Sequence, residues 1–172
     1  DSEPGLRIPN MFSAAVEGTF KGLFVQGEDI AQSDPNTKHV NEALENLECL
    51  VVQDLFLNET AAFAHVFLPG TSFLEKDGTF TNAERRINRV RKVKAPMTGK
   101  DEWRVVCEIA TAMGYPMTYN SASEIMDEVA LVTPTFAGVS FKRLDEMGSI
   151  QWPCNDKAPN GTPLMQVGGY VR

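Results

Sequence analysis

The stretch that most constrains the fold is a short apolar run set between glycines and followed by two acids. Residues 23–25 are Leu-Phe-Val, Gly27 comes shortly after them, and Glu28 and Asp29 follow. A continuous apolar run of this length predicts a strand buried on both faces of a parallel sheet. Ligands of open α/β sheets bind just outside the carboxyl ends of the strands, so these acids are placed to accept N–H donors of a purine or ribose. A plain turn with solvated acids is the alternative.

The same arrangement recurs once along the chain, and a third apolar run follows it. Residues 49–52 form a second apolar run that ends in Gln53 and Asp54, and residues 65–68 form a third that ends in Pro69-Gly70. A helix is predicted over 37–47, and a shorter one opens near Asn58. This alternation of strands and helices predicts a mainly parallel sheet built from βαβ units. Because no GxGxxG motif is present, a standard NAD-binding first turn is not predicted.

The pattern changes after Pro69. Residues 73–99 predict an extended, hairpin-like excursion, and Asp101 is the expected N-cap of a helix that runs to Met113. We therefore expect a three-layer α/β fold with one cofactor-binding core made of residues 10–72 and 100–133. The remaining expectations are an irregular lead-in before a short helix at 11–17, a helix from Ser121 or Ser123 to about 132, one or two turns at 141–147, and an irregular tail over 150–172.

Charge and cysteine usage narrow the possible functions. The formal charge of −7 argues against general nucleic-acid binding, and no apolar run is long enough to predict insertion into a membrane. Three widely spaced cysteines and two isolated histidines predict neither disulfides nor a metal site within the chain, which favours a reducing cytoplasm. The first residue is Asp1 rather than Met, and no basic-then-apolar signal pattern follows it, so we expect either a processed chain or, in preference, an excised fragment of a longer protein.

Seven basic residues gather in one short segment of this acidic chain. No acid interrupts the segment 85–100, so it forms either a solvated face or a surface for phosphates or an acidic partner. Its cations are Arg85, Arg86, Arg89, Arg91, Lys92, Lys94 and Lys100.

Polar groups at the ends of the predicted strands suggest a nucleotide-like ligand. The carboxylates would hold a guanine or a ribose, and Lys76 and the arginines after Asn82 would bind phosphates. Asp101, at the start of a predicted helix, is a further polar group of this kind. No nucleophile has a histidine near it in sequence, so the residues predict no catalytic group.

Three segments resemble the molybdopterin-dependent oxidoreductases. They read GEDIAQSDPN at 27–36, VVQDLFLNETA at 51–61 and EKDGTFTNAERR at 75–86. Within that family the chain is most similar to the alpha (catalytic) subunit of bacterial formate dehydrogenases, particularly the cytoplasmic NAD-linked kind. Three segments in the right order make this resemblance specific, and it covers nearly the whole chain.

The resemblance implies a bis(molybdopterin guanine dinucleotide) cofactor with molybdenum or tungsten, a nearby 4Fe-4S cluster, and oxidation of formate to carbon dioxide. It also implies partner subunits that carry flavin and iron–sulfur clusters. The expected contacts with the guanosine end of one pterin dinucleotide are Gly27, Glu28, Asp29, Gln53 and Asp54. Lys76 and Asp101 are expected as further cofactor contacts.

The residues that perform the redox chemistry in this family have no counterpart here. The metal-ligating cysteine or selenocysteine, its neighbouring histidine, the substrate arginine and the cluster cysteines would all lie upstream of Asp1. We therefore expect no catalytic or metal-ligating residue in this chain. Two alternatives stay open: a structural or electron-transfer subunit of the NADH dehydrogenase type, and another molybdopterin enzyme such as nitrate reductase.

Overall fold

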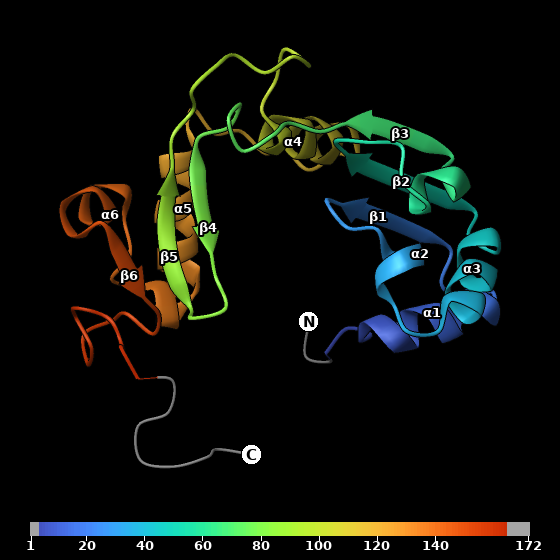
Figure 1. The fold of residues 1–172 in the computed structure, drawn as a ribbon, viewed down its shortest axis with the longest axis horizontal. Helices are drawn as coiled ribbons and strands as arrows, with labels where there is room; N and C mark the ends of the chain where they lie inside the picture. Colours follow the sequence, from blue (N-terminus) through green and yellow to red (C-terminus); the bar gives the residue numbers. More distant parts are fainter. Residues whose placement is uncertain (1–3, 165–172) are drawn as a thin grey trace. The chain divides into compact units, whose positions relative to one another are not determined.

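The computed structural model describes residues 4–164, which form two compact units that divide between Thr71 and Ser72 (Figure 1). The first unit contains a three-stranded sheet of strands β1 (Gly22–Gln26), β2 (Cys49–Asp54) and β3 (Val66–Pro69) in the order β1-β2-β3. Both strand pairings are parallel. The predicted α/β fold with a parallel sheet is therefore confirmed, and the strands lie close to their predicted positions.

Two helices cover one face of this sheet. They are α1 (Ile8–Val16) and α3 (Thr37–Glu45), and a single turn, α2 (Ile30–Ser33), follows β1. Helix α3 begins where the Asn36 side chain accepts a hydrogen bond from the N–H of His39, as expected for an N-cap. A short 3₁₀ helix, η1 (Thr60–Phe63), lies between β2 and β3.

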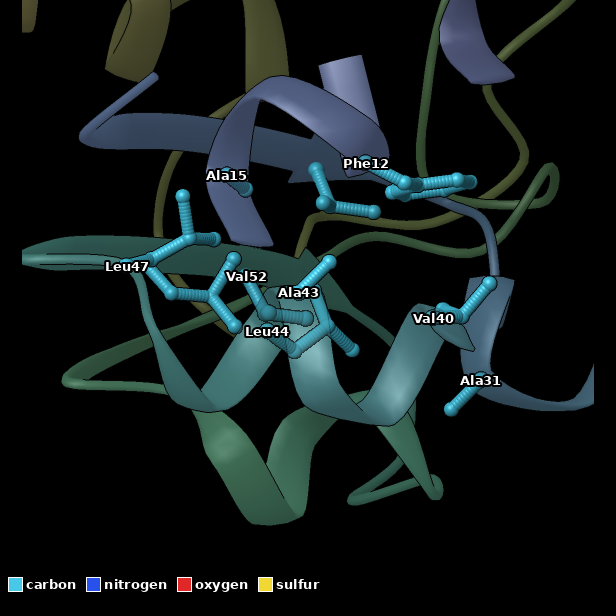
Figure 2. Packing of buried hydrophobic residues seen from close by; sticks show 10 residues of the cluster. Phe12, Ala15, Ala31, Val40, Ala43, Leu44, Leu47 and Val52 are labelled. Carbon is cyan, nitrogen blue, oxygen red and sulfur yellow. The ribbon is translucent and has the colours of Figure 1, made fainter. Parts of the chain in front are cut away.

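The core of the first unit follows from helical and strand periodicities. Apolar residues of α3 recur three and four positions apart, which places them on one side of the helix. They pack with α1 and with alternate residues of the strands (Figure 2). The fully or nearly fully buried members include Phe12, Ala15, Val25, Val40, Ala43, Leu44, Leu47, Leu50 and Val52.

The second unit contains a small antiparallel sheet, β4-β5-β6, and several helices. Strands β4 (Gly78–Thr81) and β5 (Arg86–Val90) form the predicted hairpin. The other elements are α4 (Glu102–Ala112), α5 (Ala122–Val132), η2 (Pro134–Phe136), α6 (Phe141–Met147) and β6 (Ser149–Gln151). Ile87, Met126, Val139, Leu144, Ile150 and Cys154 form its buried core.

Several boundaries differ from the sequence-based expectation. Helix α1 begins at Ile8 rather than near Met11, because Pro9 occupies the first turn, where its missing N–H costs nothing. Strand β6 stands where an irregular tail was predicted, and it pairs with β5. The later part of that tail, 165–172, lies outside the described residues. Residues 100–133, which we grouped with the first core, fall within the second unit.

Within the described residues, no helix is both long enough and apolar enough to cross a membrane.

Candidate functional site

The carboxyl edge of the parallel sheet brings together the two predicted ligand-binding segments. Gln26 of β1 lies opposite Gln53 of β2 in the parallel register. Residues 27–29 and 53–54 therefore leave the sheet at the same edge. The N–H of Gly27 donates to the carbonyl of Gln53 at 2.9 Å, and the positive φ of Gly27, +64°, turns the chain there.

Asp29 links the loop after β1 to the start of η1. Its Oδ1 accepts hydrogen bonds from the N–H of Thr60 at 2.9 Å and from the Thr60 hydroxyl at 2.7 Å. Thr60 is completely buried, and its Oγ1 accepts in turn from the N–H of Ala31 at 3.0 Å. Both bonds to Asp29 fall on one oxygen, so the half-buried carboxylate keeps acceptor capacity on the other.

Asp54 organises the loop that follows β2. Its Oδ1 accepts from the N–H of Leu55 at 2.6 Å, and its Oδ2 accepts from Nδ2 of Asn58 at 3.0 Å. The side-chain oxygen of Asn58 accepts from the N–H of Ala61 at 2.9 Å, which fixes the start of η1. A carboxylate can accept about four hydrogen bonds, so Asp54 retains room for a ligand.

Gln53 carries a buried donor without a partner. Its side chain is 1% exposed, and its Oε1 accepts from Nε2 of Gln26 at 3.1 Å. Its own Nε2 has no hydrogen-bond partner among the described residues. A buried donor left unpaired costs about 1–3 kcal/mol. Such an atom calls for a missing partner, such as a ligand acceptor.

The negative charge at this edge favours binding of a ligand's hydrogen-bond donors over binding of its phosphates. Glu28 is exposed, and its Oε1 accepts from the Ser33 hydroxyl at 2.5 Å. With Asp29, Asp54 and Glu59 it makes four acids in the segments 26–30 and 53–59, and neither segment contains lysine or arginine. The edge therefore suits N–H and O–H groups, as a guanine or a ribose presents.

The other two predicted contacts belong to the second unit. Lys76 forms an ion pair with Glu102 at the start of α4. Asp101, the N-cap residue of the same helix, makes no capping bond and instead lies 2.7 Å from the ammonium of Lys92. The structure thus brings Lys76 and Asp101 to one end of α4 and engages both in ion pairs.

The basic segment 85–100 finds its partners inside the second unit. The guanidinium of Arg85 donates to the carbonyls of Trp152, Thr162 and Leu164. Each of the other six cations lies within ion-pairing distance of a carboxylate, namely Glu84, Asp77, Asp145, Asp101, Glu75 or Glu108. Each of the seven cations therefore has a hydrogen-bonding or ion-pair partner within the described part of the second unit.

Sequence reasoning missed the residues that hold the site in shape. Gln26 could have been found from the parallel register, which places it beside Gln53. The spacing of four residues between Asp54 and Asn58 was a local signal for a closed loop. No local signal joins Asp29 to Thr60, because the two are distant in sequence.

The described residues offer no metal site of their own. No group of three or more histidine, cysteine, aspartate or glutamate side chains there could hold a metal ion. Cys49 is exposed, Cys107 and Cys154 are buried, and all three are free thiols.

An α/β unit with hydrogen-bonding side chains at the carboxyl edge of a parallel sheet is typical of proteins that bind nucleotide-like groups. Comparison with known families defines this more closely. The molybdopterin oxidoreductase family model matches residues 1–112, more than half of the sequence. The chain belongs to the molybdopterin oxidoreductase family.

Relatives with known names agree with this assignment. The chain is 44% identical to F420-dependent formate dehydrogenase 1 subunit alpha of Methanococcus maripaludis, over 96% of this chain and 25% of that protein. It is 42% identical to formate dehydrogenase H of Escherichia coli, over 94% of this chain and 23% of that protein. The chain thus spans about a quarter of the length of these relatives.

A solved structure supports the fold. Acetylene hydratase from Pelobacter acetylenicus superposes with a TM-score of 0.65 over 89% of this chain and 22% of that protein. At 22% sequence identity, this likeness concerns the fold alone.

Proposed function

We propose that this chain forms part of the binding wall for a molybdopterin guanine dinucleotide in the alpha subunit of a formate dehydrogenase. The observation that carries the proposal is the unpaired, buried amide of Gln53 at the same end of the sheet as Asp29 and Asp54. Guanine and ribose present N–H and O–H donors together with acceptor atoms, and this edge offers matching groups for both.

The residues fit such a group in chemistry as well as in position. The carboxylates of Asp29 and Asp54 would accept from the base or ribose, and Nε2 of Gln53 would donate to an acceptor of the ligand. Glu28 and the turn at Gly27 would line the same edge. Lys76 and Asp101 stay predicted contacts that rest on the family resemblance.

The cofactor, when bound, would supply the metal and the redox chemistry that oxidise formate to carbon dioxide. This chain's residues would hold and orient it, and we assign none of them to the reaction. A bis form of the cofactor, molybdenum or tungsten as its metal, and a 4Fe-4S cluster elsewhere in the enzyme are parts of this proposal.

The named relatives favour formate as the substrate over nitrate, and an enzyme over a purely structural subunit. The electron acceptor has two candidates. The sequence motifs resemble the NAD-linked type, with partner subunits that carry flavin and iron–sulfur clusters, whereas the Methanococcus relative is named as F420-dependent. We propose a cytoplasmic location, because the three cysteines are free.

Substitution of Asp54 in a full-length alpha subunit that carries this sequence tests the proposal. Asp54→Asn keeps the shape of the side chain but weakens its acceptance from a ligand. A charge-assisted hydrogen bond contributes about 1.5–3 kcal/mol, so the hold on the cofactor should weaken about tenfold to hundredfold. The measurement is the guanine nucleotide released from the purified, desalted enzyme.

The matched control is Glu48→Gln. Glu48 precedes β2 at the opposite end of the strand and pairs with Lys21 at 2.6 Å, with both side chains largely exposed. It should leave cofactor content unchanged. Equal cofactor content in both variants and the unsubstituted enzyme would refute the assigned edge.

A further inference from the structure

Phe56 stands at the carboxyl edge of the sheet with most of its ring in solvent. It is 75% exposed, and its neighbours Leu55 and Leu57 are 48% and 78% exposed. In the described part of the first unit, Phe56 and Leu57 are the most exposed of the large hydrophobic side chains. Such a cluster of exposed apolar residues marks a place where another group binds.

The loop that carries Phe56 is held from both ends. Asp54 bonds to the N–H of Leu55 and to the side chain of Asn58, and Asn58 bonds to the N–H of Ala61. These bonds enclose residues 55–57. Because the loop is tied down on either side, the ring of Phe56 is presented to solvent by a fixed segment of backbone.

The ring of Phe56 can contact the face of a base, which the polar groups at this edge cannot. A purine base has polar edges and an apolar, aromatic face. Gln53, Asp29 and Asp54 offer groups for the edges of a base, but none of them suits its face. Phe56 is the only aromatic residue among residues 26–30, 53–59 and 69–71, which are the parts of these loops and strand ends that belong to the first unit.

We infer that Phe56 is a stacking platform for the guanine base of the bound dinucleotide, with Leu55 and Leu57 as its apolar margin. This inference rests on the function proposed above and assigns the face of the base to a residue two positions after Gln53-Asp54. Stacking of a base on an aromatic side chain changes affinity by about fivefold to hundredfold when the ring is removed.

The test uses the 172-residue chain with guanosine monophosphate as the probe. Phenylalanine rings are labelled with carbon-13, and their resonances are followed during titration. We expect the Phe56 ring signals to shift through the ring current of the base. Phe56→Ala and Phe56→Leu should both weaken binding about fivefold to hundredfold, while Phe56→Trp should retain it.

Two further variants separate the possible outcomes. Asp54→Asn reports on the edge contacts of the proposed function, and Leu131→Ala removes an 84% exposed apolar side chain from the second unit as a control. If Asp54→Asn weakens binding while Phe56→Ala and Phe56→Leu bind normally, the stacking platform is refuted and the proposed function stands.

The remaining outcomes are equally decisive. Suppose that Phe56→Leu binds guanosine monophosphate as the original chain does, while Phe56→Ala does not. The side chain at position 56 then provides only apolar packing, of the kind that would also suit a bound protein segment. Stacking is not needed in that case, and the inference fails. If guanosine monophosphate at millimolar concentration shifts no resonance of the unsubstituted chain, the inference and the guanosine site fall together. Amide spectra of every variant establish that each is folded.

Discussion

The guanidinium of Arg89 lies directly over the ring of Phe141, with its Cζ 3.7 Å from the ring centroid. The same group lies 3.1 Å from a carboxylate oxygen of Asp77 and 3.4 Å from one of Asp145. The Arg89 side chain is only 9% exposed. A single cation thus ties the β4–β5 hairpin to α6.

Removal of this cation should destabilise the second unit. A desolvated cation–π contact contributes about 2 kcal/mol, so we expect Arg89→Leu to cost at least about 2 kcal/mol of unfolding free energy. Both tryptophans lie in the second unit, so denaturant unfolding followed by tryptophan fluorescence reports on it. In a double-mutant cycle with Phe141→Leu, a coupling near zero would show that ring and cation do not interact.

Glu75 should make stability depend on pH in the acid range. The N–H and the hydroxyl of Ser72, then the N–H of Met97, donate to this carboxylate and lower its pKa from 4.5 to about 2. Because the folded state favours the charged form, the stabilisation is full above about pH 4.5 and is lost as the pH falls through about 2.

Thermal unfolding of Glu75→Gln against pH tests this. The variant should unfold at a lower temperature than the original chain at neutral pH, and the difference should shrink as the pH falls from about 4.5 toward about 2. Glu108→Gln, which removes a largely exposed partner of Lys100, is the control and should change little. A constant difference across the range would contradict the assignment.

Thr60 should be hard to replace even by a side chain of the same shape. Thr60→Val loses the hydroxyl bond to Asp29 and leaves the N–H of Ala31 without its acceptor. A buried unpaired donor and a lost charge-assisted bond together cost about 2.5–6 kcal/mol. Hydrogen exchange of the Ala31 amide should speed up strongly. Protection equal to that in the original chain would mean that the Asp29–Thr60 link carries no stability.

Replacement of Gln53 should weaken cofactor binding without lowering the stability of the fold. Because its Nε2 is buried and unpaired, Gln53→Leu should leave the stability of the isolated chain within about 1 kcal/mol or raise it. The same substitution should weaken retention of the guanine dinucleotide in the full-length subunit. A large loss of stability without any loss of cofactor would show that Gln53 serves the fold alone.

Local patterns predicted the strands, because each consists of an apolar run that needs no distant partner to be recognised. Strand β6 escaped notice because Ile150 is its only apolar residue and its pairing with β5 joins distant parts of the chain. The start of α1 was placed too late because Pro9 was interpreted as part of an irregular lead-in, although proline is well suited to a first helical turn.

The grouping of the site segments at one end of the sheet was predictable from the sequence, whereas most of their side-chain hydrogen bonds were not. Parallel strands must end at one edge, so the grouping of Gly27 to Asp29 with Gln53 and Asp54 follows from the sequence. The bond from Thr60 to Asp29 does not, because it depends on where η1 packs. In the same way, the basic run looked unpaired because Asp145, which neutralises Arg89 and Arg91, lies far downstream.

The strand order of the two sheets implies that they complete their pairing at different stages of synthesis. In the first unit every strand pairs with its neighbour in sequence, so the sheet can close once Pro69 has left the ribosome. In the second unit, β5 must wait for β6, and until Gln151 emerges one side of the hairpin keeps unpaired backbone groups that invite aggregation. Nascent chains stalled after Pro69 has emerged but before Gln151 has should therefore carry a protease-resistant first unit and a hairpin that chaperones bind. Equal digestion of both units by a protease would contradict this order.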